Sequence, residues 1–81
     1  MPMRSAPKDK YVRLRRFLIE QRVKAGLSQA GLAARLGRLQ SYVSKYERGE
    51  RRLDVIELLE VCAALGVDWQ SCINHVESSR P

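Results

Sequence analysis

The sequence predicts an all-α protein in which five short helices form one compact domain. Apolar residues recur at intervals of three or four along successive segments, and no stretch alternates with period two for long enough to form a strand. Glycines separate these segments, as is typical of helix ends. The chain has 81 residues, which corresponds to one small domain that buries about 60% of its unfolded surface.

The first helix is expected from residue 9 to about residue 25, after a flexible basic arm of residues 1–9. Gly26 ends this helix. Its apolar face consists of Tyr11, Leu14, Leu18 and Ala25, with Phe17 beside them. Its opposite face is charged and carries Arg13, Arg16, Glu20 and Lys24.

Two further helices are joined by a connection of only three or four residues around Gly37. Ser28 is a good N-cap for the first of them, which runs to Leu36. The next helix ends at Arg48, before Gly49. The apolar stripe that we expect to face the protein consists of Leu39, Val43 and Tyr46.

The last two helices lie in a more apolar and more acidic part of the chain. Asp54 caps the fourth helix, and Glu57, three residues later, completes a capping-box pattern. Gly66 ends that helix, and Asp68 begins a fifth, short one. The apolar surface of the fourth helix contains Val55, Ile56, Leu58, Leu59, Val61, Cys62 and Leu65. The fifth helix carries Trp69, Cys72, Ile73 and Val76.

The charge of the chain is strongly asymmetric. Residues 1–52 carry 14 basic and 4 acidic residues, a local charge of +10, whereas residues 53–81 carry 1 basic and 5 acidic residues, a local charge of −4. A polyanion is therefore the natural partner of the first part, and charge alone leaves nucleic acid and anionic membrane both open. No stretch approaches the ~20 apolar residues of a membrane span, and the N-terminus lacks the pattern of a secretory signal. We expect a cytoplasmic protein.

The residues that usually carry catalysis or bind metal are sparse. Cys62 and Cys72 lie ten positions apart, and His75 cannot complete a zinc site with them. Two buried free thiols and a surface histidine are the simpler interpretation. There is no nucleophile–base pair and no phosphate-binding glycine loop, so we expect no enzyme activity, no metal and no cofactor.

The spacing around Gly37 is typical of a helix-turn-helix. A glycine permits the positive φ of a sharp turn, and Ala33, four residues earlier, is small enough for two helix axes to cross closely. Leu32, Leu36 and Val43 are expected to pack beneath the crossing. The order of these motifs matters more than any one of them: GLSQ, LAARLG, QSYVSK, ERGERR and ALGV.

With these motifs in this order, the chain resembles the helix-turn-helix domain of phage repressors and Cro proteins, the Xre family. The resemblance implies a compact, lambda-repressor-like domain of five helices over residues 10–74. Its helix-turn-helix spans residues 28–48, and residues 75–81 form a tail. The third helix would enter the DNA major groove, which gives its polar flank a partner.

The resemblance also implies which residues contact DNA. Glutamine can pair with adenine, lysine with guanine and serine with either base, and the residues at matching positions are Gln40, Ser41, Ser44 and Lys45. Phosphate contacts are expected from Ser28, Gln29, Arg38, Arg48, Arg51 and Arg52. Tyr42 either contacts sugar or phosphate or covers the turn.

Arg22 interrupts the apolar face of the first helix, and a buried charge requires a partner. The resemblance supplies Glu47, at the end of the third helix, as that partner in a structural ion pair. Three positions depart from the family pattern. Leu39 stands where Ser or Thr usually caps the third helix, Arg38 replaces an apolar residue, and Gly31 replaces a frequent Glu.

One recognition helix reads only a few base pairs, so repressors of this kind usually dimerise. The expected dimer interface is Trp69, Ile73 and Val76, although Trp69 would equally serve as a core residue, and the N-terminal arm could instead reach along the groove. The predicted function is a transcriptional regulator, a homodimeric repressor that binds a palindromic operator. The origin is expected to be bacterial or phage, with the protein on the nucleoid when bound. The alternative is an antitoxin or adaptor that contacts another protein and binds DNA only secondarily.

Overall fold

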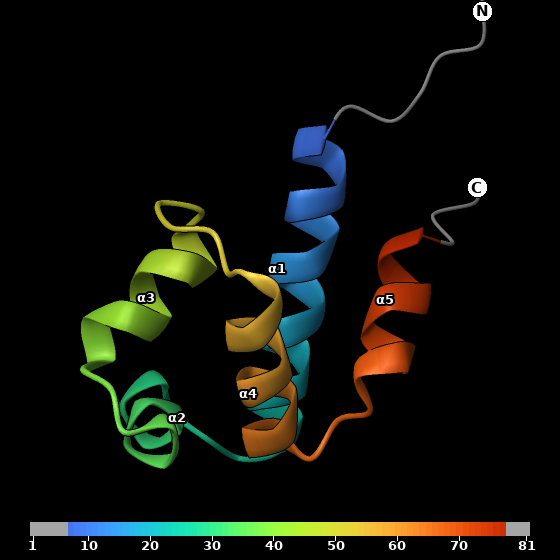
Figure 1. The fold of residues 1–81 in the computed structure, drawn as a ribbon. Coiled ribbons are helices and arrows are strands. Elements are labelled where there is room, and N and C mark those ends of the chain that lie inside the picture. The colour runs from blue at the N-terminus through green and yellow to red at the C-terminus, as the bar shows by residue number, and fades with distance from the viewer. Residues whose placement is uncertain (1–6, 78–81) are drawn as a thin grey trace, which may run out of the picture.

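Five helices and short connections make up the fold of the computed structural model, which describes residues 7–77. The helices are α1 (Pro7–Lys24), α2 (Gln29–Leu36), α3 (Gln40–Arg48), α4 (Val55–Leu65) and α5 (Trp69–Glu77). Within residues 7–77 there is no strand, so the all-α prediction is confirmed. Figure 1 shows α2 and α3 on one side of α1 and α4, and α5 on the other.

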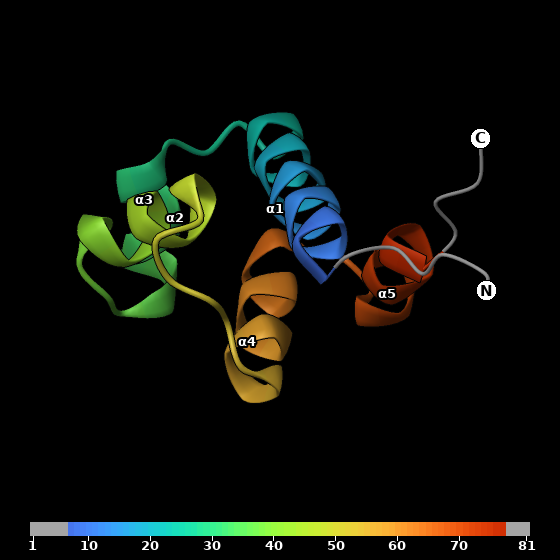
Figure 2. The same ribbon diagram turned by 90° about the horizontal axis from the view of Figure 1, so that it is seen from above.

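The core joins all five helices. α1 packs against α3, α4 and α5, while α2 packs against α3 and α4. Seen from above, α1 and α4 separate the helix-turn-helix from α5 (Figure 2). The buried apolar side chains are Phe17, Leu18, Leu32, Ala33, Tyr42, Val43, Tyr46, Val61, Cys62, Leu65 and Cys72.

The helix caps at Ser28 and Asp54 are present where the sequence predicted them. The side chain of Ser28 accepts a hydrogen bond from the backbone N–H of Gly31. Asp54 and Glu57 form the complete capping box, in which each side chain accepts a hydrogen bond from the backbone N–H of the other. Both caps satisfy N–H groups that the first helical turn leaves without partners.

Both ends of the domain are more helical than expected. α1 begins at Pro7, so residues 7–9 of the expected arm form its first turn, which suits a proline because the first helical position needs no N–H donor. At the other end α5 continues to Glu77, three residues past the expected boundary. The backbone carbonyl of Val76 accepts a hydrogen bond from Arg13 Nε at 3.1 Å, and this ties the end of α5 to α1. The rest of the expected arm and tail lies outside the described residues.

Several apolar residues are not where the helical wheel placed them. Ala25 is exposed because α1 ends at Lys24 and the chain turns at Gly26. Val55 and Ile56, at the start of α4, are 71% and 64% exposed, since the core contacts of α4 come from its C-terminal half. Cys62 and Cys72 are buried free thiols, as expected. His75 is exposed, but its ring lies 5.0 Å from that of Phe17.

Candidate nucleic-acid interface

The turn between α2 and α3 sets the angle at which α3 leaves the domain. Gly37 has φ 68°, and its N–H and that of Arg38 donate to the carbonyls of Ala34 and Ala33. A Cβ at Gly37 would meet no atom within 4 Å. Glycine is therefore required here by the left-handed backbone and not by lack of space.

The outer face of α3 presents its polar side chains to solvent. Gln40, Ser41 and Lys45 are exposed, and Ser44 is half-buried. The hydroxyl of Ser44 donates to the carbonyl of Ser41 at 3.3 Å, an internal contact that competes with any outside partner. All four lie on one flank of the helix, because positions i, i+1, i+4 and i+5 share a side. The structure thus brings together the residues that were expected to read bases.

The inner face of α3 packs against the domain. Val43 and Tyr46 are buried, as predicted for the stripe that faces the protein. The prediction was wrong for Leu39, whose side chain is 79% exposed. Leu39 occupies the N-cap position with an extended backbone (φ −72°, ψ 152°), so it does not follow the helical periodicity. As expected from its side chain, it makes no capping hydrogen bond.

An ion pair fastens α3 to α1. Arg22 Nε and Nη2 donate to the two carboxylate oxygens of Glu47 at 2.7 and 3.1 Å, and both side chains are largely buried. Arg22 Nη1 also donates to the carbonyl of Leu27 at 2.8 Å. A bidentate pair in which the third guanidinium nitrogen also donates a hydrogen bond fixes the orientation of both groups. The pair that the resemblance implied is present in the structure.

The same carboxylate connects the starts of α2 and α3. Gln29 Nε2 donates to Glu47 Oε1 at 2.9 Å, while Gln29 Oε1 accepts a longer hydrogen bond, 3.5 Å, from Gln40 Nε2. A chain of contacts therefore runs from Arg22 in α1 to the exposed start of α3. It restricts the rotamers of Gln29 and Gln40 before any DNA is bound.

The arginines expected to contact phosphate differ in how firmly they are held. Arg48 is exposed and forms a bidentate pair with Glu50 at 2.9 and 3.1 Å. Arg51 makes a bidentate pair with Glu57 at 3.1 and 2.7 Å, and this carboxylate is mostly covered. The hydrogen bonds from Arg51, with that from the Asp54 backbone N–H, lower the pKa of Glu57 to about 2. Arg48 is thus the easier of the two to redirect toward a phosphate.

Tyr42 supports the guanidinium groups of Arg38 and Arg51 from beneath. Its ring is buried, and Arg38 and Arg51 lie over it at 4.4 and 4.7 Å from the ring centroid. Such cation–π contacts hold the charges near the surface of the interface. Of the two roles left open for Tyr42, this geometry favours covering the turn. Arg52 is held in a similar way over the ring of Tyr11, at 4.2 Å.

Two features of this surface were missed at the sequence level. Leu39 contributes an exposed apolar group beside Ser41 and Lys45, in a shallow groove of about 310 Å³. The sequence signal that could have indicated this exposure is the position of Leu39 at the start of the helix, where Ser or Thr usually forms the cap. The glutamates that partner the arginines were also missed, because Glu57 was assigned only to its helix cap. Glu60, at 3.8 Å from Arg38, lies one helical turn further along the same helix.

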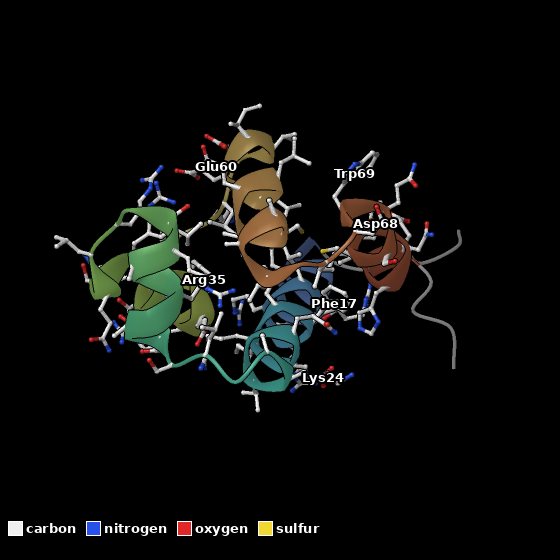
Figure 3. All side chains as sticks on the ribbon, turned by 90° about the horizontal axis from the view of Figure 1, so that it is seen from below. Phe17, Lys24, Arg35, Glu60, Asp68 and Trp69 are labelled. Carbon is white, nitrogen blue, oxygen red and sulfur yellow. The ribbon has the colours of Figure 1, made fainter. Side chains whose placement is uncertain are left out.

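The residues expected at a dimer interface lie on the far side of the domain, on α5. Trp69 and Ile73 are 48% and 40% exposed, and Val76 is half-buried. Figure 3 shows the Trp69 side chain projecting from the start of α5 into solvent. Trp69 is therefore not a core residue of the single chain.

Other kinds of site find no support in the part of the chain that the structure describes. Among residues 7–77 there is no group of three His, Cys, Asp or Glu side chains placed to hold a metal ion. None of the helices in this range combines the length and the apolar character that crossing a bilayer requires.

Comparisons with known proteins agree with this geometry. A family model described as "Helix-turn-helix" matches residues 18–71, which is more than half of the chain. An "Uncharacterized HTH-type transcriptional regulator y4dJ" of Sinorhizobium fredii (strain NBRC 101917 / NGR234) is 40% identical over 81 residues, which cover 100% of this chain and 88% of that protein. A solved structure of an "XRE-family like protein from Pseudomonas syringae pv. tomato str. DC3000" matches with 47% identity and a TM-score of 0.83, over 89% of this chain and 88% of the other.

The family match covers α2, α3 and the turn between them, and it includes the exposed polar flank of α3 and both partners of the Arg22–Glu47 ion pair. Fold, motif order and relatives agree on a regulator and not an enzyme. The chain belongs to the XRE family of helix-turn-helix proteins, and it is a DNA-binding transcriptional regulator.

Proposed function

We propose that the protein is a homodimeric repressor that binds a palindromic operator with α3 in the major groove. The observation that carries this proposal is the exposed polar flank of α3, which the Arg22–Glu47 pair and the Gly37 turn hold outward as a rigid unit. A preorganised reading surface loses little conformational freedom on binding. Since DNA is the target, the proposed place of action is the cytoplasm, on the nucleoid.

Base recognition is assigned to the flank of α3. Gln40 is assigned to adenine and Lys45 to guanine, because glutamine and lysine match the major-groove edges of those bases. Ser41 accepts either base, and Ser44 has the weakest role because its hydroxyl already has an internal partner. The exposed Leu39 side chain fits a thymine methyl group.

Backbone contacts are assigned to residues that surround this flank. Arg48 exchanges Glu50 for a phosphate at little cost, because an exposed ion pair contributes little to stability. Arg51 keeps its ion pair with Glu57 and contributes mainly through the position of its positive charge. Ser28 and Gln29 place a phosphate at the start of α2. The full set of proposed phosphate contacts is Ser28, Gln29, Arg38, Arg48, Arg51 and Arg52, and Tyr42 supports Arg38 and Arg51 from beneath.

Dimerisation is assigned to α5. Trp69, Ile73 and Val76 lie three or four positions apart and share one side of the helix. Exposed aromatic and branched apolar side chains of this kind are typical of interface centres. The negative charge of residues 53–81 keeps this face away from DNA phosphates.

The test is selection of bound fragments from random DNA, followed by affinity measurement at several salt concentrations. We expect two inverted half-sites about 10 base pairs apart, centre to centre, and an affinity that falls steeply with salt because each contacted phosphate releases a counterion. Selected sites without inverted symmetry would refute the dimeric arrangement. An affinity that hardly changes with salt would refute the phosphate contacts.

A further inference from the structure

A pocket lies on the side of α3 that faces α1, away from the polar flank. It is bounded by α1, by the last turn of α3 and by residues 49–53, which lead into α4. Figure 1 shows this loop passing from the end of α3 across to α4, beside α1. The pocket has a volume of about 170 Å³. A cavity of about 150 Å³ accepts benzene in another protein, so one six-membered ring fits.

The walls of this pocket are apolar. Leu18 and Tyr46 are completely or almost completely buried, and they form the wall nearest the core. Leu14, Leu53 and the ring of Tyr11, each half-buried, complete the lining. Small-molecule sites combine apolar walls of this kind with a few fixed polar groups.

The polar groups are three arginines, Arg15, Arg51 and Arg52. Arg15 lies against the backbone of Gly49, where an added Cβ would be 2.8 Å from its guanidinium carbon. Arg52 is fixed over the ring of Tyr11. Within residues 9–77, neither Arg15 nor Arg52 forms an ion pair with a carboxylate. Two positioned guanidinium groups beside apolar walls therefore have unused hydrogen-bond donors.

DNA binding does not account for this combination. A phosphate can approach the arginines from outside, but the apolar groups of DNA, such as the thymine methyl groups, lie within the grooves and do not reach the leucine walls on the inner side of α3. A molecule that satisfies both parts has a carboxylate for the guanidinium groups, which bind it in a planar, bidentate manner. It also has a compact apolar body that fills the space above Leu18.

We propose that this pocket binds a small monocarboxylate with a ring or a branched aliphatic body, about the size of benzoate. Occupancy has a consequence for the regulator. Arg52 is among the proposed phosphate contacts, so an anion held by Arg52 and Arg15 reduces the positive potential that DNA meets. The ligand then lowers the affinity for DNA. This second step rests on the proposed function, whereas the binding itself does not.

Binding is tested first without DNA, by titrating benzoate into the protein and following backbone amide signals by NMR. We expect saturable shifts in α1, in the last turn of α3 and in residues 49–53. Acetate, which lacks the ring, and benzyl alcohol, which lacks the charge, are expected to bind at least tenfold more weakly. Equal shifts with all three compounds, or shifts that do not saturate, would overturn the proposal.

Arg15→Gln and Arg16→Gln form a matched pair of variants. Arg15 lines the pocket, while Arg16 is exposed and does not. We expect Arg15→Gln to weaken benzoate at least tenfold and Arg16→Gln to leave the dissociation constant within twofold of the original. The same loss in both variants would mean that benzoate responds to overall charge, which contradicts a built site.

A second variant is expected to increase the preference for a larger ligand, a change that misfolding would not produce. Leu53→Ala enlarges the pocket, so the ratio of naphthoate to benzoate affinity is expected to rise at least fivefold. An unchanged ratio would place the ring elsewhere and overturn the assignment. Finally, benzoate is compared with acetate at equal ionic strength in a DNA-binding assay. If benzoate binds to the pocket but leaves DNA affinity unchanged, the coupling is refuted, and a failure to bind any DNA refutes only the proposed function.

Discussion

α3 and α5 are both nine-residue helices, yet α3 exposes mainly polar side chains to solvent and α5 exposes large apolar ones. α3 buries its aromatic and branched residues and exposes glutamine, serine and lysine. α5 buries Cys72 and leaves Trp69 and Ile73 substantially exposed. A helix that hides its apolar side is complete within its own chain, whereas one that exposes it has an unfilled contact. This difference is why we propose α3 as the surface that contacts DNA and α5 as the surface that contacts a second copy of the chain.

The two helices also differ in how they are held. α3 is attached by a buried, bidentate ion pair at 2.7 and 3.1 Å, which continues through Gln29 to its exposed start. α5 is attached by apolar packing around Cys72, by the Arg13 contact to the carbonyl of Val76, and by an exposed pair of Lys10 with Glu77. The main polar attachment of α3 is therefore a buried ion pair, whereas α5 is attached by one hydrogen bond and an exposed ion pair in addition to its apolar packing.

The largest effect is expected from Glu47→Ala, which leaves Arg22 buried without its partner. We expect the free energy of unfolding to fall by about 3–5 kcal/mol, measured by urea denaturation. Glu50→Ala, which removes an exposed ion pair with Arg48, is the control and should change stability little. If the two variants lose equal stability, the buried pair does not hold α3 in place.

The apolar face of α5 is tested by Trp69→Ala. Removing an aromatic anchor from an interface centre is expected to weaken the dimer by about 2 kcal/mol or more, measured by sedimentation at several concentrations. Val23→Ala removes an exposed apolar side chain from α1 and serves as the control. A monomeric original protein, or a dimer that tolerates Trp69→Ala, would contradict the role of α5.

The reading flank of α3 is tested by Lys45→Ala. We expect a loss of about 1–3 kcal/mol of discrimination at one base position, because a single base-edge contact is removed. Arg52→Ala is expected instead to weaken all DNA sequences alike and to reduce the salt dependence. Competition binding with single-base operator variants distinguishes the two outcomes. A uniform effect of Lys45→Ala would remove it from base recognition.

The smallest effect concerns the loop after α3 and its dependence on pH. The hydrogen bonds from Arg51 and the Asp54 backbone N–H lower the pKa of Glu57 from 4.5 to about 2. A carboxylate whose pKa is lowered on folding stabilises the native state above its unfolded pKa, and this contribution is lost as the pH falls from about 4.5 to about 2. Thermal unfolding over this range should depend less on pH in Glu57→Gln than in the original protein. The exposed substitution Glu20→Gln should retain the original profile.

The helix boundaries within the domain and the helix caps were predictable because local residues determine them. Ser28, Asp54 and Gly37 act through contacts within three or four positions of the chain, and all three occupy the expected places. The outward flank of α3 was predictable for the same reason, since periodicity alone separates Gln40 and Lys45 from Val43. The same periodicity wrongly predicted that Leu39 faces the protein, because the N-cap residue has an extended backbone and lies outside the helical repeat.

Contacts between residues that lie far apart in the sequence were much harder to predict from the sequence. The partner of Arg22 was named only through a family resemblance, because 25 residues separate it from Glu47. The stacking of Arg38 and Arg51 on Tyr42, and the end of α5 at Glu77, depend on elements that approach only in the folded chain. No local pattern encodes such contacts.

What the amino-acid order determined unaided was the set of helices, their caps, the tight turn and the division of charge, since each depends on neighbours along the backbone. Folding in three dimensions decided which cations are held by carboxylates, which apolar groups stay uncovered on α4 and α5, and where a cavity remains beside α3. Those outcomes depend on distances between remote segments, which are set by how five short cylinders pack around one small core.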